Sequence, residues 1–194
     1  ADSSANATAL APYWDLAASD TPANAADLVK YLRGYDNPNG TSANFRLRQA
    51  EEASAETAQD VWKLGAVITS TPRVLRQGAV SSYADPTGTY HDFYTSSAVT
   101  SRASMVFVGA NDGMLHAFYP GDVEGVSATD KTAELKTGNG GAPGKEAWAF
   151  IPQNALPYLR WYGGLEPGCH IPTVDYRVQL IDAAVGGSAT DTMN

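Results

Sequence analysis

At 194 residues, the chain is long enough for one good-sized domain or for part of a larger protein. Its 21 acidic residues outnumber 13 basic ones, which gives a formal net charge of −8, and no cluster of lysine and arginine stands out. Nucleic acid is therefore excluded as an expected partner, because contacts with phosphates supply most of the affinity for DNA and RNA. No apolar run reaches the roughly 18–20 residues of a membrane span, and any signal peptide is expected to be removed or to lie outside these residues.

The composition is typical of a secreted, loop-rich β-protein. Pro, Gly, Ser, Thr and Asn are abundant, lysine is sparse, and ten tyrosines accompany four tryptophans. The single cysteine, Cys169, cannot form a disulfide within the chain. An odd cysteine in a secreted protein suggests a disulfide to another chain or to a missing segment. A buried thiol that acts as a small hydrophobic side chain is the alternative, and both interpretations stay open.

Residues 21–34 carry the clearest helix signals. Thr21 can serve as the N-cap, Pro22 fits the first helical position, and Gly34 fits the left-handed residue after the last turn. The expected buried stripe consists of Leu28, Val29, Tyr31 and Leu32.

The segments on either side of this helix are weaker in pattern. Residues 1–20 are predicted to be extended and to dock through a cluster of apolar side chains at Leu10, Tyr13, Trp14 and Leu16. Residues 35–45 fail as a calcium loop, since the first ligand position before Gly40 holds no carboxylate, and a plain loop is the preferred interpretation. Residues 46–60 fit a second short helix. Asn6 and Asn39 begin glycosylation sequons, although chance explains both equally well.

From Trp62 onward the residue pattern is typical of β-strands. Residues 61–76 contain an apolar run in which Pro72 places its strand at an edge or at a strand start. Residues 81–97 are predicted to be a tyrosine-rich loop, with turn signals at Asp85-Pro86 and Gly88.

Residues 105–119 predict a β-hairpin. Two apolar runs flank Asn111-Asp112-Gly113, a strong turn signal, and Asp112 is explained by turn chemistry. Apolar residues on both faces of the two strands imply cover on both sides. A polar loop (residues 120–143) and another strand, in which Trp148 and Phe150 are in phase, are predicted to follow.

The three histidines do not indicate an active site. His116 shares a strand face with Met114 and Phe118, so a packed, hydrogen-bonded histidine is preferred over a catalytic one. His91 and His170 lie in different segments, and Cys169-His170 alone gives neither a metal site nor a haem attachment motif. No catalytic residue, metal ligand or cofactor is therefore predicted.

The order of strand, Asn111-Asp112-Gly113, strand, loop and Gly144-Lys145-Glu146-x-Trp148 resembles one blade of a quinoprotein-type β-propeller. The resemblance implies that Trp148 docks between neighbouring blades. Residues 102–118 and 144–160, above all "AFIPQNALPYL" at 149–159, resemble the C-terminal propeller of the PilC/PilY family of type IV pilus tip adhesins and assembly factors. Residues 26–34 and 62–75 resemble the lead-in of that domain, so the similarity spans about residues 26–172.

The resemblance implies a mainly β fold. Residues 1–60 would be an extended and helical lead-in, and residues 61–194 the first blades of a propeller that is incomplete without further chain. An incomplete ring exposes sheet edges and an apolar blade face, so other blades or another chain are expected to complete it, with Cys169 as a covalent tie. Calcium is implied for a loop of the parent protein and for no residue here.

The resemblance also implies the function: a non-enzymatic, extracellular protein of type IV pilus biogenesis and tip adhesion. It would contact minor pilins or the tip complex and a host or mineral surface. Tyrosines at positions 83, 90 and 94 would suit such contacts or would pack a loop. The alternatives are a fragment of a quinone-cofactor dehydrogenase, for which the chain shows no convergent set of charged groups, and a subunit of an extracellular filament.

Overall fold

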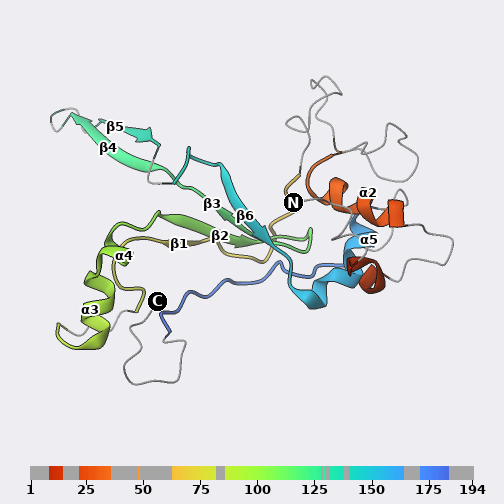
Figure 1. Cartoon of the computed structure of the whole chain (residues 1–194). Helices are drawn as coiled ribbons and strands as arrows, with labels where there is room; N and C mark the ends of the chain where they lie inside the picture. Colours follow the sequence, from red (N-terminus) through yellow and green to blue (C-terminus); the bar gives the residue numbers. More distant parts are fainter. Residues whose placement is uncertain are drawn as a thin grey trace. The chain divides into compact units, whose positions relative to one another are not determined.

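The structure is a computed structural model, and it describes residues 9–14, 22–35, 48, 63–81, 86–127, 129, 132–137, 140–163 and 171–183. These residues fall into two compact units that interleave along the chain (Figure 1). The helical unit comprises Ala1–Ile68, Ala110–Met114 and Ile151–Asp175, and the sheet unit comprises Thr69–Gly109, Leu115–Phe150 and Tyr176–Asn194. The expected boundary between residues 60 and 61 lies outside the described residues and stays a prediction, as does the helix at 46–60.

In its described residues, the helical unit contains the 3-10 helix η1 (Ala11–Trp14), helix α2 (Pro22–Leu32), the 3-10 helix η3 (Gln153–Tyr158) and helix α5 (Leu159–Tyr162).

Its buried cluster is built on Trp14, Ala25 and Leu28, with Leu10 packed against it. The extended conformation expected for residues 1–20 is wrong at residues 9–14, which are helical. A helical turn places Leu10 and Trp14 on the same side, so both can join one cluster.

Helix α2 ends as its sequence predicts. Gly34 has a φ of 103°, and the amides of Gly34 and Tyr35 donate to the carbonyls of Tyr31 (2.9 Å) and Lys30 (3.1 Å). This is the hydrogen-bond pattern of a Schellman cap. Leu28 and Tyr31 are buried as expected, while Val29 and Leu32 of the predicted stripe are half-buried. Thr21, the predicted N-cap, lies outside the described residues.

The sheet unit contains a four-stranded antiparallel sheet in the order β1-β2-β3-β6. Its strands are β1 (Arg73–Leu75), β2 (Met105–Gly109), β3 (Leu115–Phe118) and β6 (Glu146–Phe150). The predicted hairpin is confirmed as the antiparallel pair β2–β3, and the edge strand predicted after Pro72 is confirmed as β1. Consecutive strands of this sheet pair with one another, so it is a meander (Figure 1). Residues 76–104 connect β1 to β2, and residues 119–145 form an insertion between β3 and β6.

That insertion corrects the polar loop expected at residues 120–143. It contains a two-stranded ribbon, β4 (Asp122–Ser127) and β5 (Thr132–Lys136), which forms a sheet of its own. Sequence analysis missed it because its strands carry charged residues at alternate positions and resemble a solvated loop.

The tyrosine-rich stretch at 81–97 is also corrected, since its described part contains helix α3 (Thr89–Thr95), followed by helix α4 (Ser97–Thr100). Gly88 precedes α3 without any side-chain cap, which removes the usual start signal.

Helices and strands both contribute substantially to the described residues, so the mainly β expectation is too strong. The described residues form one four-stranded sheet and one ribbon rather than a closed propeller. Among the described helices, none combines the length and the apolar character that crossing a bilayer demands.

Glycine at position 34 is predicted to stabilise the end of α2, because a φ of 103° strains any residue that carries a Cβ. A Cβ on Gly34 would meet the flexible Lys63 side chain, which can move aside, so backbone strain decides the cost. Gly34→Ala is expected to lower the free energy of unfolding by about 1 kcal/mol. Gly125→Ala, in the β4 strand, is the control, because Gly125 has no left-handed φ and the Cβ of an alanine there would meet no atom within 4 Å, so stability should change by less than about 0.5 kcal/mol. Equal losses in urea denaturation would contradict the role of the left-handed conformation.

Candidate functional site

The residues of the predicted blade motif lie in two places. Asn111, Asp112 and Gly113 form the turn between β2 and β3, within the helical unit, whereas residues 144–148 lead into and occupy β6 in the sheet unit. Each group is therefore a site of its own.

The turn shows the chemistry predicted for Asp112. Its Oδ1 accepts a hydrogen bond from the Met114 amide at 3.1 Å, and Gly113 adopts a φ of 87°. The Gly113 amide donates to the Ala110 carbonyl at 3.2 Å. An aspartate that bonds an amide two residues ahead stabilises the turn locally, as expected.

The second carboxylate oxygen of Asp112 makes a contact that the sequence did not predict. Oδ2 accepts a hydrogen bond from the Gly65 amide at 2.8 Å, and the Asn111 amide donates to the Ala66 carbonyl at 3.0 Å. A Cβ on Gly65 would lie 2.5 Å from the Asp112 nitrogen, so only glycine permits this approach. Asp112 thereby fastens the hairpin turn to a residue 47 positions earlier in the chain.

Two more aspartates hold backbone in the same way. Asp175, also in the helical unit, accepts the Ile68 amide with both oxygens, at 3.0 and 3.2 Å. In the sheet unit, Asp182 accepts the Val80 amide at 2.9 Å and the Tyr90 hydroxyl at 2.6 Å. We call Asp112, Asp175 and Asp182 the aspartate clasps. Sequence reasoning missed the last two, and no local pattern marks them, because their donors lie about a hundred residues away.

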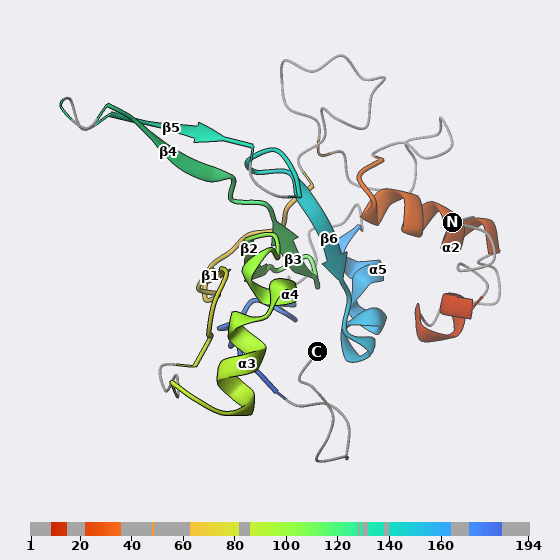
Figure 2. The same cartoon turned by 60° about the vertical axis from the view of Figure 1, so that its left-hand side comes forward.

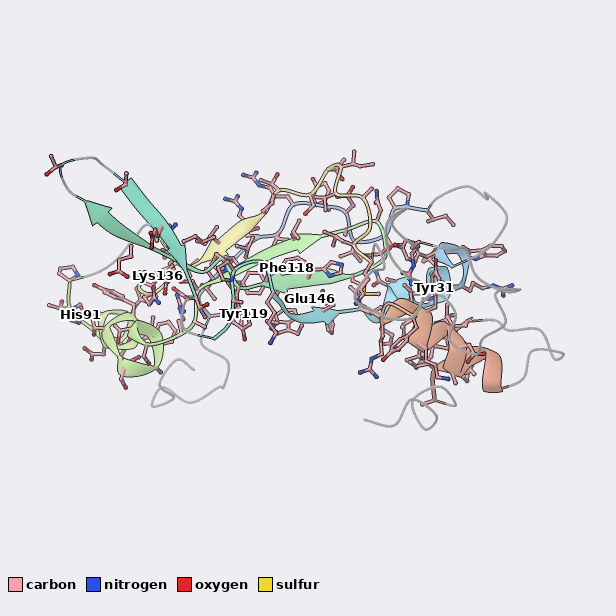
Figure 3. The ribbon with its side chains drawn as sticks, turned by 90° about the horizontal axis from the view of Figure 1, so that it is seen from above. Tyr31, His91, Phe118, Tyr119, Lys136 and Glu146 are labelled. Atoms are coloured by element: carbon pink, nitrogen blue, oxygen red, sulfur yellow. The ribbon has the colours of Figure 1, made fainter. Side chains whose placement is uncertain are left out.

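His116 is confirmed as a packed, hydrogen-bonded histidine. It is 5% exposed, its Nδ1 lies 2.6 Å from Oε1 of Glu146, and its ring stacks on Phe118 at 5.8 Å between centroids. Figure 3 labels these two partners, Phe118 in β3 and Glu146 in β6. A carboxylate can only accept, so Nδ1 carries the proton in this pair. The contact joins β3 to β6 and gives Glu146 of the blade motif a structural partner.

Trp148 lies on the face of β6 opposite to that of Glu146. One side of its indole packs on Phe107 at 5.7 Å between ring centroids, and the residue is 42% exposed. Its docking between blades stays a prediction. Before β6, the Gly144 amide donates to the Tyr119 carbonyl at 2.8 Å and the Tyr119 amide to the Lys145 carbonyl at 3.0 Å, so both motif residues fix the start of the strand.

The tyrosines of α3 are only partly exposed. Tyr90 and Tyr94 meet edge to face at 5.4 Å, and both are half-buried, while Tyr83 lies outside the described residues. Desolvation by burial raises the pKa of the Tyr90 hydroxyl, and its hydrogen bond to Asp182 raises it further. Tyr90 thus packs and bonds within the sheet unit.

Cys169, His170, Asn6, Asn39 and the segment tested as a calcium loop (residues 36–45) lie outside the described residues, so the predictions for them stay open. Nδ1 of His91, the remaining histidine, lies 3.4 Å from Oδ1 of the neighbouring Asp92. Within the described ranges, no group of three or more His, Cys, Asp and Glu side chains could hold a metal ion.

Removal of the Asp112 charge is predicted to destabilise the chain. Asp112→Asn weakens hydrogen bonds to two amides in a buried position, and the expected loss is about 1–3 kcal/mol in the free energy of unfolding. Asp122→Asn, at an exposed position of β4, is the control and should change stability by less than about 0.5 kcal/mol. Chemical denaturation measures both, and matching effects would mean that the clasp contributes nothing.

The contribution of Tyr90 is predicted to depend on pH. Because its pKa is raised in the folded state, the stabilisation is present below the unfolded pKa of about 10 and is lost as pH rises through the folded value. Tyr90→Phe should cost about 1 kcal/mol at neutral pH and progressively less in alkali. Tyr176→Phe, at a residue 79% exposed, should show no such difference. A Tyr90→Phe deficit that is constant through alkaline pH would refute the assignment.

Comparison of the sequence with known proteins finds similar segments in pilus biogenesis factors. The chain is 32% identical over 168 residues to the "Type IV pilus biogenesis factor PilY1" of Pseudomonas aeruginosa strain PAK, which covers 84% of this chain and 11% of that protein. The PilY1 of P. aeruginosa strain PAO1 matches at 32% over 168 residues, with the same coverage. A "PilY1 homolog" of Xylella fastidiosa strain Temecula1 is 30% identical over 181 residues, which is 90% of this chain and 10% of that protein.

No protein-family model and no solved structure matches the chain. The chain spans about a tenth of the length of the curated relatives that it matches. The aligned stretch is nonetheless most of this chain, and two PilY1 proteins and one PilY1 homolog share it. The resemblance predicted from residues 102–118 and 144–160 is thus confirmed: the chain is homologous to one segment of the PilY-type type IV pilus biogenesis factors.

Proposed function

We propose that this chain is a structural, non-enzymatic segment of an extracellular protein that takes part in type IV pilus biogenesis. The observation that carries the proposal is the 32% identity to PilY1 over 84% of the chain. The clasps and the His116–Glu146 pair support a structural role, because these carboxylates and this imidazole hold backbone and strands together.

We further propose that the four-stranded sheet is one blade of a propeller that other parts of the parent protein complete. A meander of four antiparallel strands is the unit from which propellers are built. Both faces carry apolar side chains, with Phe107 and Trp148 on one and Val108 and Phe118 on the other. Phe150, in the edge strand β6, is 56% exposed. A sheet that is apolar on both faces needs cover on both, as neighbouring blades would provide.

The proposed partners are minor pilins or the pilus tip complex, and through the parent protein a host or mineral surface. Calcium binding is proposed for the parent protein alone. Cys169 is proposed to form a disulfide with a further segment or with another chain. Immunogold labelling of intact pili tests the location: label at the tips supports the proposal, whereas label repeated along the shaft supports a filament subunit.

Blade docking predicts that the effect of Trp148 depends on the rest of the protein. In the full-length protein that carries this chain, Trp148→Ala should cost about 2–4 kcal/mol and reduce the number of surface pili, because an indole between two sheets loses packing on both sides. In the isolated chain, where Trp148 is 42% exposed, the cost should be about 1 kcal/mol. Denaturation of both proteins and pilus counts by electron microscopy measure the difference.

Trp161→Ala is the matched control, since Trp161 in α5 is 61% exposed and belongs to the helical unit. It should lower stability little in either protein and leave pili unchanged. If Trp148→Ala costs the same in both proteins and pili remain normal, no neighbouring blade covers the indole and the propeller proposal fails.

A further inference from the structure

The β4–β5 ribbon has two chemically different faces. Strand pairing sets Val123 opposite Leu135 and Gly125 opposite Ala133, which places these four on one face because side chains alternate along a strand. The other face carries only charged side chains where the strand pairing is regular. In the strand register, Asp122 lies opposite Lys136 and Glu124 lies opposite Glu134. The ribbon is thus an amphipathic strip of two strands.

The apolar face has no cover from the described residues of the chain. Val123 is 73% exposed and Leu135 is 61% exposed. A Cβ on Gly125, between them and the ribbon's end, would meet no atom within 4 Å. An isolated two-stranded ribbon is marginally stable in water, and paired apolar side chains that stay exposed on it are typical of an interaction surface.

The charged face has an excess of acid. Glu124 forms an ion pair with Lys136, but Glu134, directly across from Glu124, has no cationic partner among the described residues. Like charges at opposite positions of two strands destabilise the pairing. A cation supplied from outside, next to Glu134, would remove this repulsion.

The ribbon is held firmly at its root. The hydrogen bonds between Tyr119 and residues 144 and 145 close the insertion where it leaves the sheet. Gly140 and Gly141 lie so close to the Tyr119 ring that a Cβ on either would approach it within about 2.5 Å. Both views show the two strands reaching beyond the end of the four-stranded sheet, away from β1 and β2 (Figures 1 and 2). The ribbon is therefore presented from a fixed base.

We propose that the β4–β5 ribbon is a docking arm whose apolar strip, Val123 and Leu135, lies on a protein partner that presents lysine or arginine beside an apolar surface. Charge complementarity argues for this occupant, since a basic side chain next to the strip would pair with Glu134. A second copy brings the same acids and a net charge of −8, which opposes self-association. An anionic lipid surface is repelled for the same reason.

A titration of the whole chain with a defined probe tests the proposal. The probe is a fluorescent synthetic peptide of alternating lysine and valine, and the comparison peptide alternates glutamate and valine. The lysine peptide should bind, and Val123→Thr with Leu135→Thr should weaken binding at least about tenfold, because threonine keeps the strand preference but removes apolar area. Glu134→Gln should weaken it several-fold and flatten its dependence on salt.

Ile181→Thr is the matched control, since Ile181 is 70% exposed and lies in the sheet unit outside the ribbon. It should bind the lysine peptide as the unchanged chain does, and tryptophan fluorescence should show that every variant stays folded. Equal binding of the two peptides, or full binding by the double threonine variant, would overturn the proposal. So would a dimer in sedimentation that the threonine substitutions abolish, because the occupant would then be a second copy.

Discussion

A buried carboxylate at the tip of one hairpin satisfies two needs at once. Asp112 is 2% exposed, and an ionised group so far from water requires hydrogen-bond donors in compensation. The segment that begins at Gly65 is not paired in any sheet, so its amides require acceptors. Each supplies what the other lacks, and the absence of a side chain at Gly65 lets the two backbones approach closely enough. The described part of the helical unit depends on this contact for the position of its irregular segment.

The same solution recurs at Asp175 and Asp182, which lie in an extended run near the end of the described residues. They hold Ile68 and Val80, so the stretch leading into and out of β1 is fastened at intervals by carboxylates rather than by a neighbouring strand. Such bonds to charged acceptors are stronger than neutral ones, which suits a stretch that buries little apolar area of its own. A short edge strand can persist under these conditions because its flanks are fixed.

The sheet unit leaves apolar side chains uncovered at two places. These are Phe150 of β6, and Val123 and Leu135 of the β4–β5 ribbon. The ring contact of Trp148 with Phe107 orients the indole while leaving much of it accessible. The internal hydrogen bonds stabilise the framework, and the exposed apolar residues are available for association.

The amino-acid sequence by itself determined the local features of this chain. The Schellman end of α2 at Gly34, the β2–β3 hairpin with its Asp112 turn, the edge strand after Pro72 and the packed state of His116 all follow from residue chemistry within a few positions. The family resemblance could also be recognised from the sequence, since it rests on contiguous motifs. Only the tertiary structure decided the partners of Asp175 and Asp182, the helix α3 and the ribbon in place of loops, and the pairing of His116 with Glu146. These depend on which distant segments meet, and a hydrogen bond that spans about a hundred residues leaves no periodic trace along the chain.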